Sequence, residues 1–155
     1  MIARMLHFTR SLAQDLRGSM VIETAIVAPV LLVLALGGFE SSRIVARQAE
    51  LQTAAAEAAA IVRASPPKTA DERTVVHDVV KTSLGLADTD VTVTPLFRCG
   101  AEDAFVDAET SCEESATVSY YIEVVITDSY TPMWTSFGVG GPVDYRVERM
   151  VFISS

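Results

Sequence analysis

One carboxylate stands in a run of residues that otherwise carries no charge. Glu23 is the only ionisable side chain between Met20 and Phe39, and a carboxylate that faces lipid costs about 2.5 kcal/mol or more. It needs a cation, or it must reach the headgroups from its place near one end of the run. Cleavage of the chain after Gly18 would supply a cation, because the new ammonium group of Ser19 lies one helical turn from Glu23 or on a neighbouring copy. The spacing therefore indicates peptide processing followed by ion pairing.

The apolar run is long enough to cross a membrane as a single α-helix. A span needs about 20 residues at about 1.5 Å each, and residues 20–39 supply that length. The preceding residues carry Arg4, Arg10 and Arg17 against a single acidic side chain. This positive charge predicts a cytoplasmic N-terminus and an extracytoplasmic C-terminal part. Pro29 lies inside the run and, because it lacks an amide hydrogen, predicts a kink there.

The residues around the run resemble a known family. A basic leader ending in Gly18, with Glu23 as the fifth residue after it, resembles the type IV prepilins, which a prepilin peptidase cleaves after that glycine. Further residues narrow the resemblance to the TadE-like minor pseudopilins of tight adherence (Tad, or Flp) type IVb pili. The matching residues are Ala25, Pro29, Gly38, Glu40, Arg43 and the alanine-rich residues 52–63. Thr24 departs from the family, which commonly has an aromatic residue there. The resemblance covers roughly residues 17–63.

This resemblance implies a function, a location and a set of partners. The chain is expected to be a minor pseudopilin that is cut between Gly18 and Ser19 and is needed to assemble Flp pili in surface adhesion. It would lie in the cytoplasmic (inner) membrane as a single-pass protein, or enter pili or be exported. Its partners would be the prepilin peptidase, other pilin or pseudopilin subunits, inner-membrane pilus assembly proteins and membrane lipid. Spans would dock side by side, with Glu23 receiving the Ser19 ammonium group and an alanine stripe permitting close approach.

Two interpretations from other classes of protein remain open. Val33-Leu34-Ala35 offers a small-residue context at which a conventional signal peptidase would release a secreted binding domain. A span that is never cleaved would instead anchor a sensor or an envelope-binding domain in the membrane. The three interpretations differ in where the mature chain begins.

Two helices are predicted beyond the run. The apolar residues of one face continue at helical spacing to Arg63, and they are Ile44, Leu51, Ala55, Ala58 and Val62. Ser65-Pro66-Pro67 ends this long helix, because proline lacks an amide hydrogen and disfavours helix in the residue before it. Thr69 and Glu72 then have the spacing of a capping box, and Gly85 suits the position after a last turn, so residues 70–84 are predicted to form a second helix.

Beyond the second helix the apolar period changes to two, which is typical of strands. Val91 and Val93 alternate with threonines, and alternate residues over 118–126 are apolar. Residues 145–153 predict a third strand, joined to the second by a loop over residues 129–141. The predicted fold is therefore α+β: an N-terminal transmembrane helix that continues into a long amphipathic helix, a second short helix, and a small antiparallel sheet of about three strands, as in pilins.

These elements divide the chain into four expected segments. They are a leader over residues 1–18, a transmembrane helix over 19–40, its extracytoplasmic continuation over 41–64, and a small extracytoplasmic α+β domain over 65–155. A chain of 155 residues has room for one span and one modest domain.

Cys99 and Cys112 are the only cysteines, and the predicted topology places both where oxidising conditions allow a disulfide. Closing a loop of this length would contribute about 3 kcal/mol in the chain-entropy model. Metal ligation is the alternative, but His77 is the only histidine outside the leader, so a four-ligand zinc site is not expected. The acidic residues between and after the cysteines match no known calcium loop and are interpreted as a solvated loop, with calcium binding as the alternative.

Composition and motifs argue against nucleic-acid binding and against catalysis. The formal net charge of −8 would repel phosphates. No Gly-x-Ser-x-Gly elbow, His-Glu-x-x-His pair or Cys-x-x-Cys motif occurs. We therefore expect no enzymatic activity, no cofactor and no metal.

Aromatic side chains in the predicted loop over residues 129–141 are candidate partner contacts. Tyr130, Trp134 and Phe137 lie there, and loop aromatics either fold back over the core or meet a partner. Folding back is the favoured interpretation. The other candidate partner contacts are Glu23 and Pro29, in the span.

Overall fold

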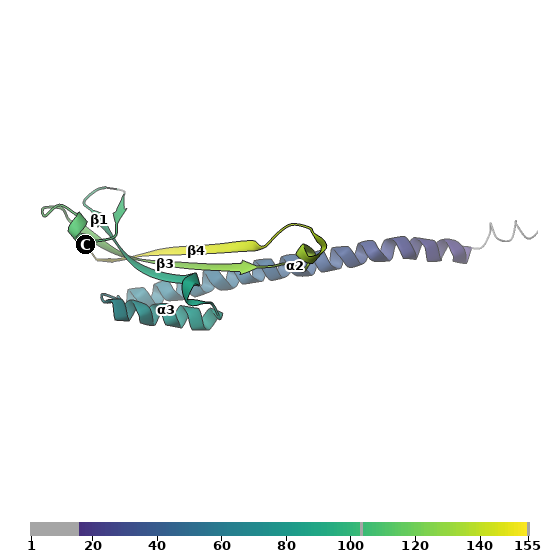
Figure 1. Ribbon diagram of the computed structural model, residues 1–155, viewed down its shortest axis with the longest axis horizontal. Coiled ribbons are helices and arrows are strands. Elements are labelled where there is room, and N and C mark those ends of the chain that lie inside the picture. The colour runs from purple at the N-terminus through teal and green to yellow at the C-terminus, as the bar shows by residue number, and fades with distance from the viewer. Residues whose placement is uncertain (1–15, 103, 155) are drawn as a thin grey trace, which may run out of the picture. The chain divides into compact units, whose positions relative to one another are not determined.

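The computed structural model describes residues 16–102 and 104–154 of the chain (Figure 1). The chain divides into two compact units, residues 1–42 and 43–155, which we call the N-terminal and C-terminal units. Helix α2 (Leu16–Ala64) supplies residues to both units. Most of the predicted leader lies outside the described residues.

In the N-terminal unit, the described residues form the first part of α2. Every side chain from Met20 to Leu36 is exposed, so within the described part of this unit the apolar surface is uncovered. The helix satisfies its own backbone polar groups, as a segment in lipid must. The Thr24 hydroxyl also bonds within the helix, because its Oγ1 donates to the carbonyl oxygen of Met20 at 2.8 Å. The helix runs through Pro29, and a kink at that residue stays a prediction.

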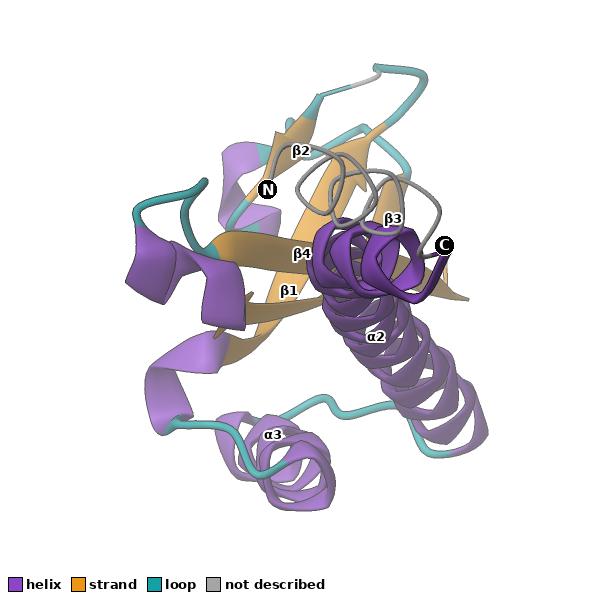
Figure 2. Cartoon of the chain, turned by 90° about the vertical axis from the view of Figure 1, so that its right-hand side faces the viewer, coloured by secondary structure: helices purple, strands orange, loops and turns teal. Residues whose placement is uncertain are grey.

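The C-terminal unit is a two-layer α+β domain. Its four-stranded antiparallel sheet has the order β2-β1-β3-β4, and the strands are β1 (Val91–Cys99), β2 (Phe105–Val106), β3 (Val118–Tyr130) and β4 (Val143–Ser154). The second part of α2 and helix α3 (Ala70–Leu84) pack on the same face of this sheet (Figure 2). Three short 3-10 helices lie in the connections, η1 (Asp88–Asp90), η2 (Glu109–Ser111) and η3 (Met133–Phe137). The predicted α+β fold is confirmed, with four strands instead of about three.

Small residues on α2 bring the helix close to the sheet. The buried side chains of this helix in the C-terminal unit are Leu51, Ala54, Ala55, Ala58, Ala59 and Val62. They pack in one core with sheet residues that are fully buried, namely Ile122, Val124, Ile126 and Val151. The predicted apolar face of the long helix is therefore confirmed. Its alanines leave room for the branched side chains of the sheet.

Helix α3 has the bounds that its capping residues predict. The Thr69 hydroxyl accepts a hydrogen bond from the Glu72 amide at 3.2 Å, and the Glu72 carboxylate accepts one from the Thr69 amide at 3.0 Å. The same carboxylate accepts a second from the amide of Lys68 at 2.7 Å. Gly85 ends the helix with a φ of 65°, in the left-handed region. Each end is thus fixed by local hydrogen bonds.

This capping box should make stability depend on pH. The backbone amides of Thr69 and Lys68 hold the pKa of Glu72 below its ordinary value of 4.5. Because the folded chain binds this proton less tightly than the unfolded chain, the contribution is full above the unfolded pKa and is lost as pH falls through the folded pKa. We expect wild type to be more stable than Glu72→Gln at neutral pH, and the difference to shrink at about pH 3. Paired thermal unfolding curves at both pH values measure it, and a difference independent of pH would contradict the assignment.

The strands are longer than the sequence predicts. β1 continues through Pro95 to Cys99 and pairs with β3 along its whole length. Proline is tolerated there because β2 pairs only with Phe97 and Arg98, so the edge of β1 beside Pro95 has no ladder to interrupt. β4 pairs with β3 from Tyr130↔Val143 to Tyr120↔Ser154. Tyr130 is therefore the last residue of a strand, and its prediction as a loop residue was wrong.

Candidate functional site

The predicted processing residues lie in the first turns of α2. Gly18 and Ser19 are helical, and Glu23 is exposed on the next turn. Among the described residues, none donates a hydrogen bond to the Glu23 carboxylate. An α-helix places residues four apart on one face, so Ser19 and Glu23 share a side of the helix. The geometry keeps the carboxylate accessible to a cation.

The alanine stripe is already used inside the C-terminal unit. Ala55 and Ala58 are 0% and 1% exposed, because the chain's own sheet covers them. These alanines permit close approach of the chain's own sheet, and close approach of a neighbouring span stays a prediction for the exposed part of α2. They pack helix on sheet, and only the exposed part of α2 remains for partners.

A hydrogen-bonded ion pair ties α2 to the far end of β3. Arg47 Nε donates to Asp128 Oδ2 at 2.6 Å, and Arg47 Nη1 donates to Glu50 Oε2 at 2.8 Å. Burial acts to lower the pKa of Arg47, but the hydrogen bonds to Asp128 and Glu50 outweigh it and raise that pKa. Arg47 and Asp128 lie 81 residues apart in the sequence, so no local sequence pattern indicated that they are in contact.

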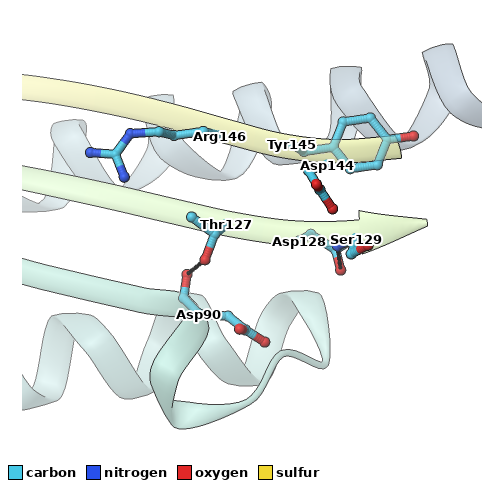
Figure 3. Close-up of a pocket in the computed structure, with 7 residues that line it drawn as sticks. All are labelled: Asp90, Thr127, Asp128, Ser129, Asp144, Tyr145 and Arg146. Carbon is cyan, nitrogen blue, oxygen red and sulfur yellow. Dashed lines mark hydrogen bonds between the residues drawn. The ribbon is translucent and has the colours of Figure 1, made fainter. Parts of the chain in front are cut away.

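A polar hollow lies beside this ion pair, at the end of the sheet where β3 and β4 connect (Figure 3). Its lining residues are Asp90, Thr127, Asp128, Ser129, Asp144, Tyr145 and Arg146. Thr127 Oγ1 donates to the carbonyl oxygen of Asp90 at 3.2 Å, and the Ser129 amide donates to Asp128 Oδ1 at 2.8 Å. Asp128 is thus held by Arg47 and Ser129, which is a structural arrangement and not a nucleophile beside its base.

The three aromatic residues predicted as partner contacts have different surroundings in the structure. The ring of Tyr130 lies 5.3 Å from the guanidinium carbon of Arg43. Trp134 is half-buried in the loop, where a Cβ added to Gly140 would lie 3.5 Å from its Nε1 atom. Phe137 is 81% exposed. Folding back over the core holds for Tyr130, which packs against the hydrophobic core. Trp134 lies against Gly140 of its own loop, and Phe137 faces outward.

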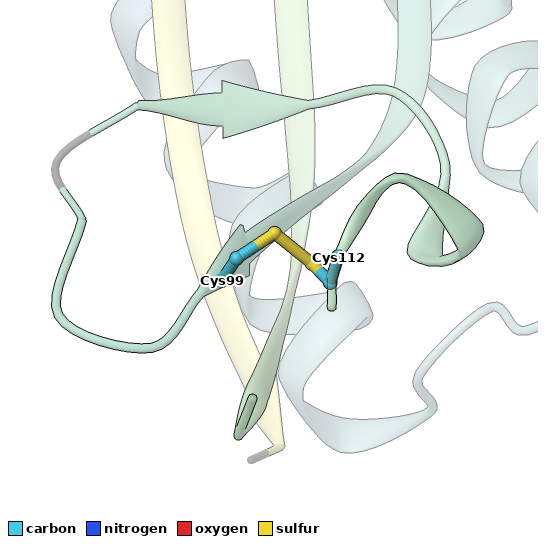
Figure 4. Close-up of a disulfide and its surroundings, with 2 residues drawn as sticks. All are labelled: Cys99 and Cys112. Atoms are coloured by element: carbon cyan, nitrogen blue, oxygen red, sulfur yellow. A yellow bond between two sulfur atoms is a disulfide. The ribbon is translucent and has the colours of Figure 1, made fainter. Parts of the chain in front are cut away.

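Cys99 and Cys112 form the disulfide that the sequence predicts, with Cα atoms 5.3 Å apart (Figure 4). The bond joins the end of β1 to the residue after η2 and encloses β2. Asp103, one of the acidic residues of this loop, lies outside the described residues. In the rest of the described chain, no three histidine, cysteine or acidic side chains gather as a metal site.

His77 makes local contacts on α3. Its Nδ1 lies 3.1 Å from Asp78 Oδ1, and its Nε2 lies 3.1 Å from the carbonyl oxygen of Asp88. The two ring nitrogens therefore face the neighbouring Asp78 on α3 and the backbone of Asp88 in η1. This arrangement connects α3 with η1.

The described elements define a class of protein: an exposed apolar helix that continues into the core of a small α+β domain. Over the described residues, α2 is the one helix long and apolar enough to cross a membrane, with a mean hydropathy of 2.3 over its most apolar window, which is compatible with single-pass anchoring. Residues 18–60 match the family model described as TadE-like protein. No curated protein and no solved structure matches the chain.

The family match confirms the resemblance that the sequence shows. It begins at Gly18 and covers Glu23, the apolar run and most of the α2 residues that lie in the C-terminal unit. TadE-like proteins are pilus components and not enzymes, so the match associates this chain with Tad pili and with other pilus subunits.

Proposed function

We propose that this chain is the precursor of a minor pseudopilin, from which prepilin peptidase removes residues 1–18. The mature chain, beginning at Ser19, would act in assembling Tad pili for surface adhesion. The start of the family match carries the proposal, because it falls on Gly18, the residue before the proposed cut. The basic residues of the leader and the exposed apolar surface of α2 support the same assignment.

In this proposal, residues 19–40 cross the inner membrane from a cytoplasmic N-terminus. Residues 41–64 and 65–155 then lie together on the extracytoplasmic side. Their shared hydrophobic core supports that placement, because α2 residues such as Leu51 and Val62 pack with α3 and the sheet. The disulfide supports it too, since such bonds persist in oxidising compartments.

The proposed chemistry of assembly is charge neutralisation in lipid. Cleavage gives Ser19 an ammonium group, and the helix already places Glu23 one turn away on the same side. A carboxylate at this depth is costly until a cation meets it. The ammonium group of the same chain or of a neighbouring subunit would remove that cost, so a lateral contact between spans becomes favourable only after processing.

The test is the N-terminus of the chain in native membranes, determined by mass spectrometry for wild type and Gly18→Ala. We expect wild type to begin at Ser19 and the variant to keep its leader. Gly37→Ala is the matched control, because a Cβ at Gly37 meets nothing within 4 Å, and it should be processed as wild type. A mature start near Leu36 would mean release by signal peptidase, and Met1 retained in wild type would mean a permanent anchor.

Replacing Glu23 by glutamine separates assembly from processing. Glutamine keeps the size of the side chain but cannot pair with an ammonium group, so we expect cleavage to continue and pilus number to fall. Electron microscopy of pili beside the mass-spectrometric assay measures both steps. Wild-type piliation in Glu23→Gln would contradict the ion-pair mechanism without affecting the assignment of the cleavage site.

A further inference from the structure

The connection between β3 and β4 is an uncharged loop with exposed apolar side chains. From residue 131 to residue 142 no side chain is ionisable, although 21% of the residues in the chain are charged. Met133, Phe137 and Val139 are 54%, 81% and 61% exposed. Three large apolar side chains thus face outward from one short loop. Exposed apolar side chains that gather in one place without charges between them mark a site of interaction.

The loop lies at the end of the C-terminal unit where α2 enters. Its flanking residues, Tyr130 and Val143, are paired across β3 and β4. Next to them, the Arg43 guanidinium carbon lies 5.3 Å from the centre of the Tyr130 ring, and Tyr145 Oη donates to the carbonyl oxygen of Ile44 at 3.3 Å. The loop therefore sits beside the first α2 residues of the unit.

Only a few residues of the chain separate this end of the unit from the apolar run. Phe39 closes that run, and Ile44 lies five residues further on. A chain extends by at most about 3.6 Å per residue, so these two residues are within about 18 Å of each other in any conformation. The loop is therefore within reach of the membrane interface.

We propose that the tip of this loop, formed by Met133, Phe137 and Val139, rests in the lipid interface as a second membrane contact. The occupant of the apolar surface is lipid, because the residues that flank the loop contact Arg43 and Ile44, a few residues after the apolar run, and because the loop carries no charge of its own. Apolar and aromatic side chains favour this depth of the bilayer. The inference rests on the membrane anchoring in the proposed function, and not on cleavage after Gly18.

Three backbone amides near the tip of the loop are hydrogen-bonded within the loop. In η3 and just after it, the amides of Thr135, Gly138 and Val139 donate to carbonyl oxygens at 3.1, 3.0 and 3.3 Å. The Thr135 hydroxyl also donates to the carbonyl oxygen of Pro132, at 2.8 Å. Polar groups left without partners are costly in lipid, so these internal bonds lower the cost of bringing the tip into the interface.

Trp134, the only tryptophan of the chain, reports on this loop without a label. The full chain is reconstituted in phosphatidylcholine–phosphatidylglycerol vesicles at a low ratio of protein to lipid, with and without lipids brominated near the headgroup. We expect brominated lipid to quench Trp134 fluorescence. Phe137→Asp should reduce that quenching about two- to fivefold, because a charge is disfavoured even at the interface.

Val75→Asp is the matched control, because it places the same charge at a 63% exposed valine of α3, and it should leave the quenching unchanged. Far-UV circular dichroism shows that each variant is folded, and Phe137→Ser, which adds no charge, replaces Phe137→Asp if that variant is not. An anchored chain whose Trp134 is quenched by aqueous acrylamide and not by brominated lipid would overturn the inference alone. So would a blue shift that grows with protein density without lipid quenching, since the loop would then meet a second copy.

Failure of the anchoring is a separate result. A chain that alkaline washing removes from the vesicles would overturn the anchoring, and with it this inference. The Gly18→Ala precursor keeps its span, so its Trp134 should be quenched as in wild type. A precursor that is not cleaved but shows lipid quenching would therefore support the loop contact while the processing step is judged on its own.

Discussion

Replacing Ala55 by leucine is expected to lower the free energy of unfolding of the C-terminal unit by about 1–3 kcal/mol. Ala55 is 0% exposed and lies in the core with Ile122 and Ile126. Leucine adds three carbon atoms where the sheet already fills the space, so either the helix must move away or side chains must leave their preferred rotamers. Thermal or denaturant unfolding of the full chain in detergent, followed by Trp134 fluorescence, measures the loss.

The neighbouring residue provides the control for this experiment. Ala56 is exposed on the opposite side of α2, so Ala56→Leu makes the same chemical change in solvent and should alter stability by a few tenths of a kcal/mol. Equal losses in the two variants would mean that helix propensity, and not packing against the sheet, decides the outcome. Loss of pilus assembly in Ala56→Leu alone would instead assign the exposed face of α2 to partners.

Local signals explain why some elements were predicted with correct bounds. Helix α3 is fixed by Thr69 and Glu72 at its start and by Gly85 at its end, and each of these residues acts on backbone groups within a few positions. The apolar face of α2 was equally visible, because helical spacing is a property of neighbours in the chain. The Gly18 to Glu23 spacing belongs to this class of signal, and the family match covers it.

Features that depend on distant parts of the chain were not predictable in this way. β2 is only two residues long and exists because β1 lies beside it, so the sequence around Phe105 shows no alternation. Arg47 and Asp128 meet only when the sheet packs on α2. The composition of the β3–β4 loop showed its aromatic residues, but not that Trp134 folds onto Gly140 while Phe137 faces outward.

Removing the disulfide is expected to cost about 3 kcal/mol, from the entropy of the loop that it closes in the unfolded chain. Cys99 and Cys112 are 13 residues apart, and both should become serine so that no free thiol remains. The loss should be concentrated around β2. Its two residues pair with Phe97 and Arg98, and such a short ladder has little stability of its own once its loop is released.

Two measurements separate the global cost from the local one. Unfolding of wild type with and without a reducing agent should differ by the same free energy as wild type and the Cys99→Ser, Cys112→Ser variant. Reducing agent should have no effect on that variant. Hydrogen exchange of the β2 amides should rise in it while exchange in β3 and β4 rises only by the global loss of stability. Unchanged protection of β2 would mean that the contact of Phe105 with the Tyr121 ring, whose centroids lie 5.2 Å apart, holds this strand without the covalent link.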